Sequence, residues 1–136
     1  MQFRLEIRIE MNENGCETSG GRVSVELSPS DALGLWRGVV LAQVEAEAPD
    51  LTLRQMAILL HIYLVTPPHT VRGLAAVLGV TKPVITRALD SMGAMGLVER
   101  MRDDKDRRNV VIKRTVAGAL YLEKLGDLII DQGRKL

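Results

Sequence analysis

The sequence predicts a mainly α-helical protein with a small amount of β structure, namely a winged helix-turn-helix with an additional N-terminal β-hairpin. Apolar residues recur with helical period over most of residues 29–136. A glycine turn at Gly79 separates two of the predicted helices, an arrangement typical of a helix-turn-helix. Directly after this pair, two short apolar runs enclose a stretch in which seven of the ten residues 101–110 are charged, which predicts a β-hairpin, the wing.

The N-terminal residues alternate between apolar and charged side chains. In residues 3–11 five apolar residues alternate with four charged ones, and residues 22–27 alternate again after a loop rich in turn-forming residues. A period of two predicts strands, so we expect residues 1–28 to form a β-hairpin. Because a single hairpin is at best marginally stable in water, its apolar face must pack on the helices or on another copy of the chain.

Capping residues predict where the next two helices begin. Ser28 as the cap, Pro29 at the first position and Asp31 in the first turn predict a helix that runs to about Glu47. Thr52 followed three residues later by a glutamine predicts the capping box of a second helix. The first helix carries the apolar stripe Leu33, Trp36, Val40 and Val44, and we expect the buried face of the second to be Met56, Leu59, Leu60 and Tyr63.

Residues 70–95 predict two helices joined by a tight turn at Gly79. Thr70 caps the first of them, with buried positions Val71, Leu74, Ala75 and Leu78. Thr81 caps the second, whose apolar face is Ile85, Ala88, Leu89 and Met92. The opposite face of this second helix carries Lys82, Thr86, Arg87 and Asp90, with Val84 beside them. A basic and hydroxylic outer face is expected of a helix that enters the major groove of DNA.

The predicted wing consists of strands at residues 97–102 and 109–114, followed by a final helix that Thr115 caps. Its tip carries Arg107 and Arg108, which we expect to contact phosphates or the minor groove; a merely solvated turn is the alternative. Three aspartates in the tip, Asp103, Asp104 and Asp106, repel DNA. We therefore expect them to restrain the arginine side chains and the turn through ion pairs.

Charge is distributed unevenly along the chain. Residues 1–50 hold four basic and nine acidic residues, whereas residues 72–115 hold ten basic and five acidic ones, within a net charge of +1. Together with the wing, this predicts sequence-selective binding of duplex DNA, with the recognition helix 81–95 in the major groove and the wing 97–114 on phosphates and the minor groove. The candidate DNA contacts are Thr81, Lys82, Pro83, Val84, Thr86, Arg87, Lys105, Arg107 and Arg108, with Asp106 supporting the wing.

The chain also resembles a known family. The segments "LGVTKPVITRALD" and "GLVER", and "DRR" followed six residues later by "T..G", resemble the winged-helix domain of the MarR family (multiple-antibiotic-resistance regulators). The resemblance covers roughly residues 52–130. It implies a homodimeric transcription factor, usually a repressor, that binds a near-palindromic operator and is often released by a small-molecule effector. Residues 29–136 would then be a MarR-like DNA-binding domain with flanking dimerisation helices. By position, Thr81, Lys82, Pro83, Thr86 and Arg87 match the family's DNA-reading helix, and Arg107 and Arg108 match its wing tip with Asp106 as the supporting acid.

Three features depart from the family's pattern. The chain ends at Leu136, where the family usually continues into another dimerisation helix; it begins with a hairpin that the family does not normally have; and Arg114 stands where an apolar residue is usual. We therefore expect the N-terminal strands, with the first and last helices, to supply the surface between protomers.

No phosphate loop, nucleophile motif or metal-ligand cluster stands out in the sequence, so we expect no enzyme, no cofactor and no metal site. A lone cysteine, no signal-peptide core and no apolar stretch long enough for a bilayer predict a cytoplasmic protein. Trp36 and Tyr63 are candidates to line an effector pocket, although core packing is the commoner fate of such residues. Two alternatives stay open: a winged-helix protein-interaction module without specific DNA binding, and a DNA-binding protein in which Cys16 is an oxidation switch.

Overall fold

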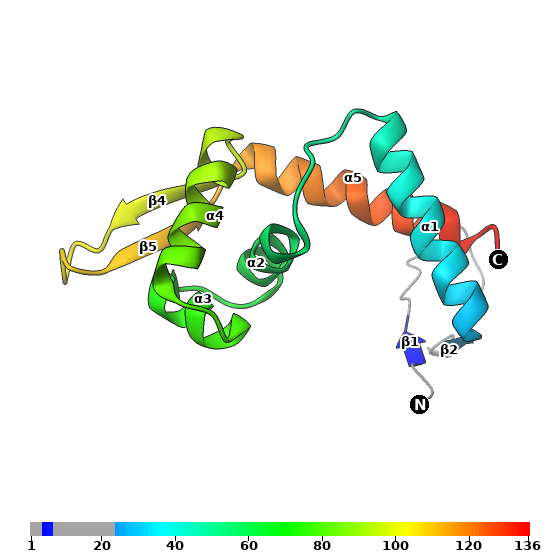
Figure 1. Cartoon of the computed structure of the whole chain (residues 1–136), viewed down its shortest axis with the longest axis horizontal. Coiled ribbons are helices and arrows are strands. Elements are labelled where there is room, and N and C mark those ends of the chain that lie inside the picture. Colours follow the sequence, from blue (N-terminus) through cyan, green and yellow to red (C-terminus); the bar gives the residue numbers. More distant parts are fainter. Residues whose placement is uncertain (1–3, 7–23) are drawn as a thin grey trace, which may run out of the picture.

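A computed structural model describes residues 4–6 and 24–136 of the chain. The elements, in order, are β1 (Arg4–Glu6), β2 (Ser24–Glu26), α1 (Pro29–Glu45), α2 (Leu53–Leu64), β3 (His69–Thr70), α3 (Val71–Leu78), α4 (Lys82–Ala94), β4 (Val98–Arg102), β5 (Val110–Arg114) and α5 (Val116–Gly133). Figure 1 shows the β4–β5 wing at one end of an elongated molecule and α1 crossing the far part of α5 at the other. The predicted winged helix-turn-helix is confirmed.

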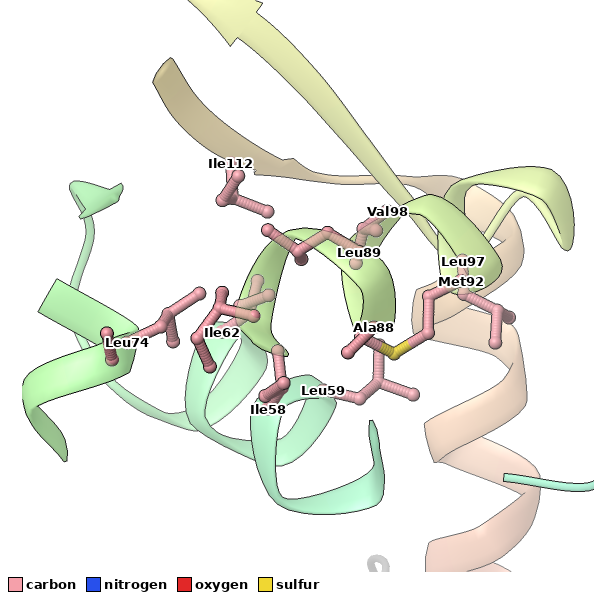
Figure 2. Close-up of a cluster of buried hydrophobic side chains, with 12 residues drawn as sticks. Ile58, Leu59, Ile62, Leu74, Ala88, Leu89, Met92, Leu97, Val98 and Ile112 are labelled. Carbon is pink, nitrogen blue, oxygen red and sulfur yellow. The ribbon is translucent and has the colours of Figure 1, made fainter. Parts of the chain in front are cut away.

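The core lies where α2, α3 and α4 pack against one another and against the base of the wing. Its fully buried side chains include Ile58, Leu59 and Ile62 of α2, Leu74 of α3, and Ile85, Leu89 and Met92 of α4 (Figure 2). The predicted apolar face of α4 is confirmed at all four positions, because an i, i+3, i+4, i+7 set places its members on one side of a helix.

The predicted buried face of α2 is partly wrong. Leu59 is buried as expected, but Ile58 and Ile62 are also fully buried, whereas Met56, Leu60 and Tyr63 are only half-buried. The sequence is apolar on most sides of this helix, so its periodicity does not specify which side faces inward. Packing against α4 and β5 decides the orientation.

The predicted helix caps form, with one exception. Ser28 with Asp31 and Thr52 with Gln55 make complete capping boxes, and the Thr70 hydroxyl accepts a hydrogen bond from the Gly73 N–H at 3.0 Å. Thr81 is the N-cap residue of α4, but its side chain makes no capping hydrogen bond. Helix α1 ends at Glu45, two residues before the predicted end.

The sheet of the wing has the strand order β3-β5-β4, and both pairings are antiparallel. Strands β4 and β5 match the predicted wing strands to within a residue. Strand β3 was missed, because two residues after a pair of prolines carry no alternating pattern. Its His69 is buried opposite Ile112, and its Nε2 lies 3.0 Å from the Val65 carbonyl oxygen.

A hydrogen-bonded junction joins α2 to the root of the wing and to α5. The Tyr63 hydroxyl donates to the carbonyl oxygens of Leu97 and Thr115, at 2.9 and 3.1 Å, and accepts from the Thr115 N–H at 2.9 Å. Gly118 lies against this hydroxyl, and a Cβ there would collide with it and with the Leu97 carbonyl oxygen. The Thr115 hydroxyl accepts from the Gly118 N–H, so the threonine and glycine of the "T..G" motif both have structural roles.

Arg114, the departure from the family pattern, caps the C-terminal end of α2. Its Nε donates to the Ile62 carbonyl oxygen at 2.9 Å, and its Nη2 donates to the Val65 carbonyl oxygen at 3.1 Å. The guanidinium also lies 5.8 Å from the centre of the Tyr63 ring. An arginine here satisfies carbonyl groups that the end of a helix leaves without intrahelical partners.

The far end of the molecule is built differently. Helix α1 packs on α5, where Gly38 makes a close contact with Gln132, and Val39 is its one buried residue. Strands β1 and β2 pair antiparallel, with Arg4 opposite Glu26, and the rest of the predicted N-terminal hairpin lies outside the described residues. Within the described part of the chain, no helix is long and apolar enough to cross a membrane.

Candidate nucleic-acid interface

Helix α4 presents its predicted polar face to solvent. Because Ile85, Ala88, Leu89 and Met92 are buried, the residues between them point away from the core. Lys82 and Arg87 are exposed, while Val84 and Thr86 are half-buried. Thr81 and Pro83 are exposed at the start of the helix. All six predicted contacts from this segment therefore lie on the surface or at its edge.

The tip of the wing is a hydrogen-bonded turn. The Asp103 N–H donates to the Asn109 carbonyl oxygen at 3.0 Å, and the Asn109 N–H donates to the Asp106 carbonyl oxygen at 2.9 Å. Lys105, Arg107 and Arg108 are all exposed on this turn. The remaining predicted contacts thus lie together at one end of the molecule, beyond α4 (Figure 1).

The aspartates of the wing stabilise its backbone rather than its arginine side chains. Asp103 Oδ1 accepts from the Lys105 N–H at 3.0 Å, and Asp106 Oδ1 accepts from the Arg108 N–H at 3.1 Å. Between described residues, the ion pairs are Arg100–Asp90 and Arg134–Asp131. The expected ion pairs with the tip arginines are therefore wrong, whereas the expected restraint of the turn is present and is made by hydrogen bonds to backbone amides. An aspartate in a turn bonds the amide two residues ahead more readily, since both groups are already close.

An ion pair that the sequence did not predict joins the recognition helix to the wing. Asp90 of α4 accepts a hydrogen bond from the Arg100 guanidinium of β4, and both side chains are partly exposed. The contact links the two elements that carry the predicted DNA contacts, so it helps fix their relative orientation.

A cleft of about 560 Å³ lies between α3, the start of α4 and the wing. Its lining brings together four of the predicted residues, namely the contacts Lys82, Thr86 and Arg108 and the supporting acid Asp106. It also includes Arg72, which sequence reasoning missed. A smaller cleft of about 250 Å³ lies beside Arg87, where Arg54 and the capping box of α2 face α4.

The two residues proposed for an effector pocket are separate in the structure. Trp36 lines a cavity of about 400 Å³ between α1, the start of α2 and α5, and Tyr63 is not part of its lining. Tyr63 instead belongs to the junction at the root of the wing. Within the Trp36 cavity, the Gln43 amide donates to the Tyr121 hydroxyl at 3.3 Å, and burial raises the pKa of that hydroxyl.

His61 and His69 meet edge to face, with ring centres 5.4 Å apart, near the C-terminal end of α2. Over residues 4–6 and 24–136, no group of three or more His, Cys, Asp or Glu side chains is placed to hold a metal ion. Cys16 lies outside the described residues.

The outward basic helix, the glycine turn before it and the arginine-tipped hairpin after it define this chain as a winged helix-turn-helix protein. Residues 50–109 match the model of the MarR family. The predicted resemblance to the MarR family is thereby confirmed over this winged-helix segment.

Solved structures share the fold of this chain. The MepR–DNA complex of S. aureus is 21% identical, with a TM-score of 0.65 over 74% of this chain and 80% of that one. The regulator Tm0710 of Thermotoga maritima is 24% identical, with a TM-score of 0.65 over 78% and 72% of the two chains. A mutant MarR from E. coli, solved in complex with operator DNA, is 27% identical, with a TM-score of 0.58 over 78% and 71%. Comparison with curated proteins gave no match.

Proposed function

We propose that this protein is a sequence-selective DNA-binding transcriptional regulator, and specifically a repressor, that acts as a homodimer on a near-palindromic operator. The observation that carries the proposal is the shared surface of α4 and the wing, where exposed Lys82, Arg87 and Arg108 lie at one end of the molecule. The structure of the mutant E. coli MarR with operator DNA supports the same use of the fold. The role is one of binding, not catalysis, and we place it in the cytoplasm.

In this proposal α4 enters the major groove. Thr86 and Arg87 contact base edges, and Val84 contacts a thymine methyl group. Lys82 binds a phosphate at the start of the helix. The wing carries Lys105, Arg107 and Arg108 to the neighbouring phosphates and minor groove, and Asp106 holds the Arg108 amide in place.

Two basic residues of this region have other partners. Arg100 pairs with Asp90, and Arg114 caps α2, so neither guanidinium is placed in the proposed DNA contact. In this scheme the positive charge offered to DNA therefore comes from the outer face of α4 and the tip of the wing.

The dimer is proposed to form at the opposite end of the molecule. Leu33, Trp36, Val40 and Val44 of α1 are exposed despite their apolar character. We infer that this face, with α5 and the N-terminal strands of residues 1–28, contacts a second copy. Two recognition helices in such a dimer would occupy half-sites about 34 Å apart.

The first test is selection of bound duplexes from a random pool, followed by a binding measurement with random duplex at low salt. We expect a two-fold symmetric site to be enriched, and weaker but measurable affinity for random DNA. A protein-interaction module would bind neither pool. Enrichment of a single, asymmetric half-site would contradict the dimeric mode but not DNA binding.

The second test replaces Arg107 and Arg108 together by alanine. Loss of wing contacts to phosphates should lower affinity for all duplexes and flatten the dependence of log K on log salt by about 0.9 for each lost contact. Replacing Lys135, an exposed cation beyond the end of α5, by alanine is the matched control and should leave the slope unchanged. An unchanged slope in the double variant would remove the wing from the proposal.

A further inference from the structure

One basic residue at the proposed interface has no role in the scheme above. Arg72 is the second residue of α3, its side chain is exposed, and it lines the cleft that also contains Lys82 and Arg108. We propose that Arg72 is a further DNA-binding residue that holds a backbone phosphate in this cleft, together with Lys82 and Arg108. The inference rests on the proposed function and adds a specific site to it.

The charge of the cleft is the first argument. Arg72, Lys82 and Arg108 come from three different elements, and none has an acidic partner within ion-pair distance among the described residues. The one carboxylate in the lining, Asp106, already accepts a hydrogen bond from the Arg108 amide. Three cations that converge on one cleft repel each other in the free protein, and a phosphate would relieve that repulsion.

The position of the cleft is the second argument. It lies between α4, which is proposed to enter the major groove, and the wing, which is proposed to reach the minor groove. In duplex DNA the sugar-phosphate backbone is what separates these two grooves. When one protein occupies both grooves, the DNA strand between them must cross the space between the recognition helix and the wing. In this protein that space is the cleft lined by Arg72.

The polar lining fits a phosphate better than a base. Asn109 and Thr70 add side-chain hydrogen-bond donors to the three cations, and Val71 and Val110 also line the wall. Phosphate oxygens accept hydrogen bonds from any of these donors without a preferred base edge. The site therefore contributes affinity and register, not sequence preference.

Hydrogen bonds of the backbone fix the position of the segment that carries Arg72. Strand β3 pairs with β5, with Thr70 opposite Val111, and α3 begins at the next residue. Arg72 is thus only two residues from the sheet of the wing. The Thr70 hydroxyl bond to the Gly73 N–H fixes the first turn of α3, which carries Arg72. The three cations need no rearrangement of the backbone to meet a phosphate.

The experiment compares Arg72→Ala and Arg72→Lys with the unchanged protein, on the selected operator and on random duplex. Lys135→Ala, which removes one exposed cation beyond the end of α5, is the matched control. Binding is measured over a range of salt concentrations, and then with operators in which one phosphate at a time is replaced by an uncharged methylphosphonate. Circular dichroism confirms that each variant is folded.

We expect Arg72→Ala to weaken binding to both duplexes by the same factor and to flatten the salt slope by about 0.9 for each protomer bound. Arg72→Lys should keep the slope, and Lys135→Ala should behave as the unchanged protein. At one phosphate position in each half-site, a methylphosphonate should weaken operator binding by the unchanged protein. The same replacement should not weaken binding by Arg72→Ala any further.

Three results would overturn the inference while DNA binding stands. The first is an unchanged slope in Arg72→Ala, and the second is a loss of operator affinity without loss of random-duplex affinity, which would indicate a base contact. The same methylphosphonate profile in Arg72→Ala and the unchanged protein would also overturn it. If the unchanged protein binds no duplex at any salt concentration, the proposed function itself has failed.

Discussion

The two ends of this molecule bury their apolar side chains to different extents. In the winged-helix end, α2, α3, α4 and the sheet enclose a core in which Ile58, Leu59, Ile62, Ile85, Leu89 and Met92 are fully buried. At the other end, α1 buries Val39 alone, while Leu33 and Val44 remain 70% and 72% exposed. The first end forms a complete core within one chain. The second has the composition of a core but too few neighbours to bury it, which is typical of a surface that another chain covers.

The largest expected effect is on the complete core. Leu89→Ala removes a fully buried side chain from the centre of α4 and should lower the free energy of unfolding by about 2–5 kcal/mol. The matched control is Leu33→Ala, the same chemical change on the exposed stripe of α1. Chemical denaturation at low protein concentration should show a change of less than about 0.5 kcal/mol for this control. Equal losses in both variants would contradict the difference between the two ends.

The next effect concerns the α1 face itself. Replacing Leu33 and Val44 together by serine should shift the protein from dimer to monomer, because the apolar area that a partner would cover is lost. Size-exclusion chromatography with light scattering at micromolar concentration measures this. Val77→Ser, a change at an exposed valine of α3, serves as the control. A double variant that remains a dimer would assign the interface to α5 or the N-terminal strands instead.

A smaller effect is expected on the recognition helix. Arg87→Ala should weaken operator binding by about 1–3 kcal/mol and relax the preference at one base position, if Arg87 pairs with a guanine. Its folding stability should hardly change, since the side chain is exposed. Binding competition among operators changed at single positions gives the readout. A uniform loss over all positions would make Arg87 a phosphate contact.

The smallest effect is a pH dependence in the α1–α5 region. Burial raises the pKa of Tyr121 above 10.0, the Gln43 hydrogen bond opposes this, and the Asp50 carboxylate adds to it. The folded state therefore holds the phenol proton more tightly than the unfolded chain. The contribution of protonated Tyr121 to the free energy of unfolding is therefore complete below pH 10. It is lost as the pH rises through the higher pKa of the folded state.

Tyr121→Phe isolates this contribution, because phenylalanine cannot ionise. Urea unfolding below and above pH 10 should show a smaller decline for the variant than for the unchanged protein. An equal decline in both would mean that other groups cause the alkaline loss of stability.

The clarity of the hydrophobic pattern in each segment explains which parts of the fold could be predicted from the sequence. The face of α4 was predictable because polar and apolar residues alternate with helical period along it. The face of α2 was not, since Ile58 and Ile62 lie in a run that is apolar on most sides. Strand β3 is defined by its partner β5, and a two-residue segment has no pattern of its own.

The candidate site, too, could be predicted only in part from the sequence. Lys82, Thr86 and Arg87 were predictable because they follow from the helix that carries them. Arg72 was not, because its approach to Arg108 depends on the pairing of β3 with β5, which the sequence did not reveal. For the wing aspartates, charge composition alone did not distinguish ion pairs with side chains from hydrogen bonds with nearby amides.

Helix α5 starts beside Thr115, at the root of the wing, and reaches Gln132, where it meets α1. It is one uninterrupted helix of 18 residues, so it is about 27 Å long. Because the helix is continuous, a tilt of about ten degrees at its α1 end would displace the wing by about 5 Å, close to the height of one helical turn. The distance between the two wings of a dimer would therefore depend on how the remote ends of the two chains pack together.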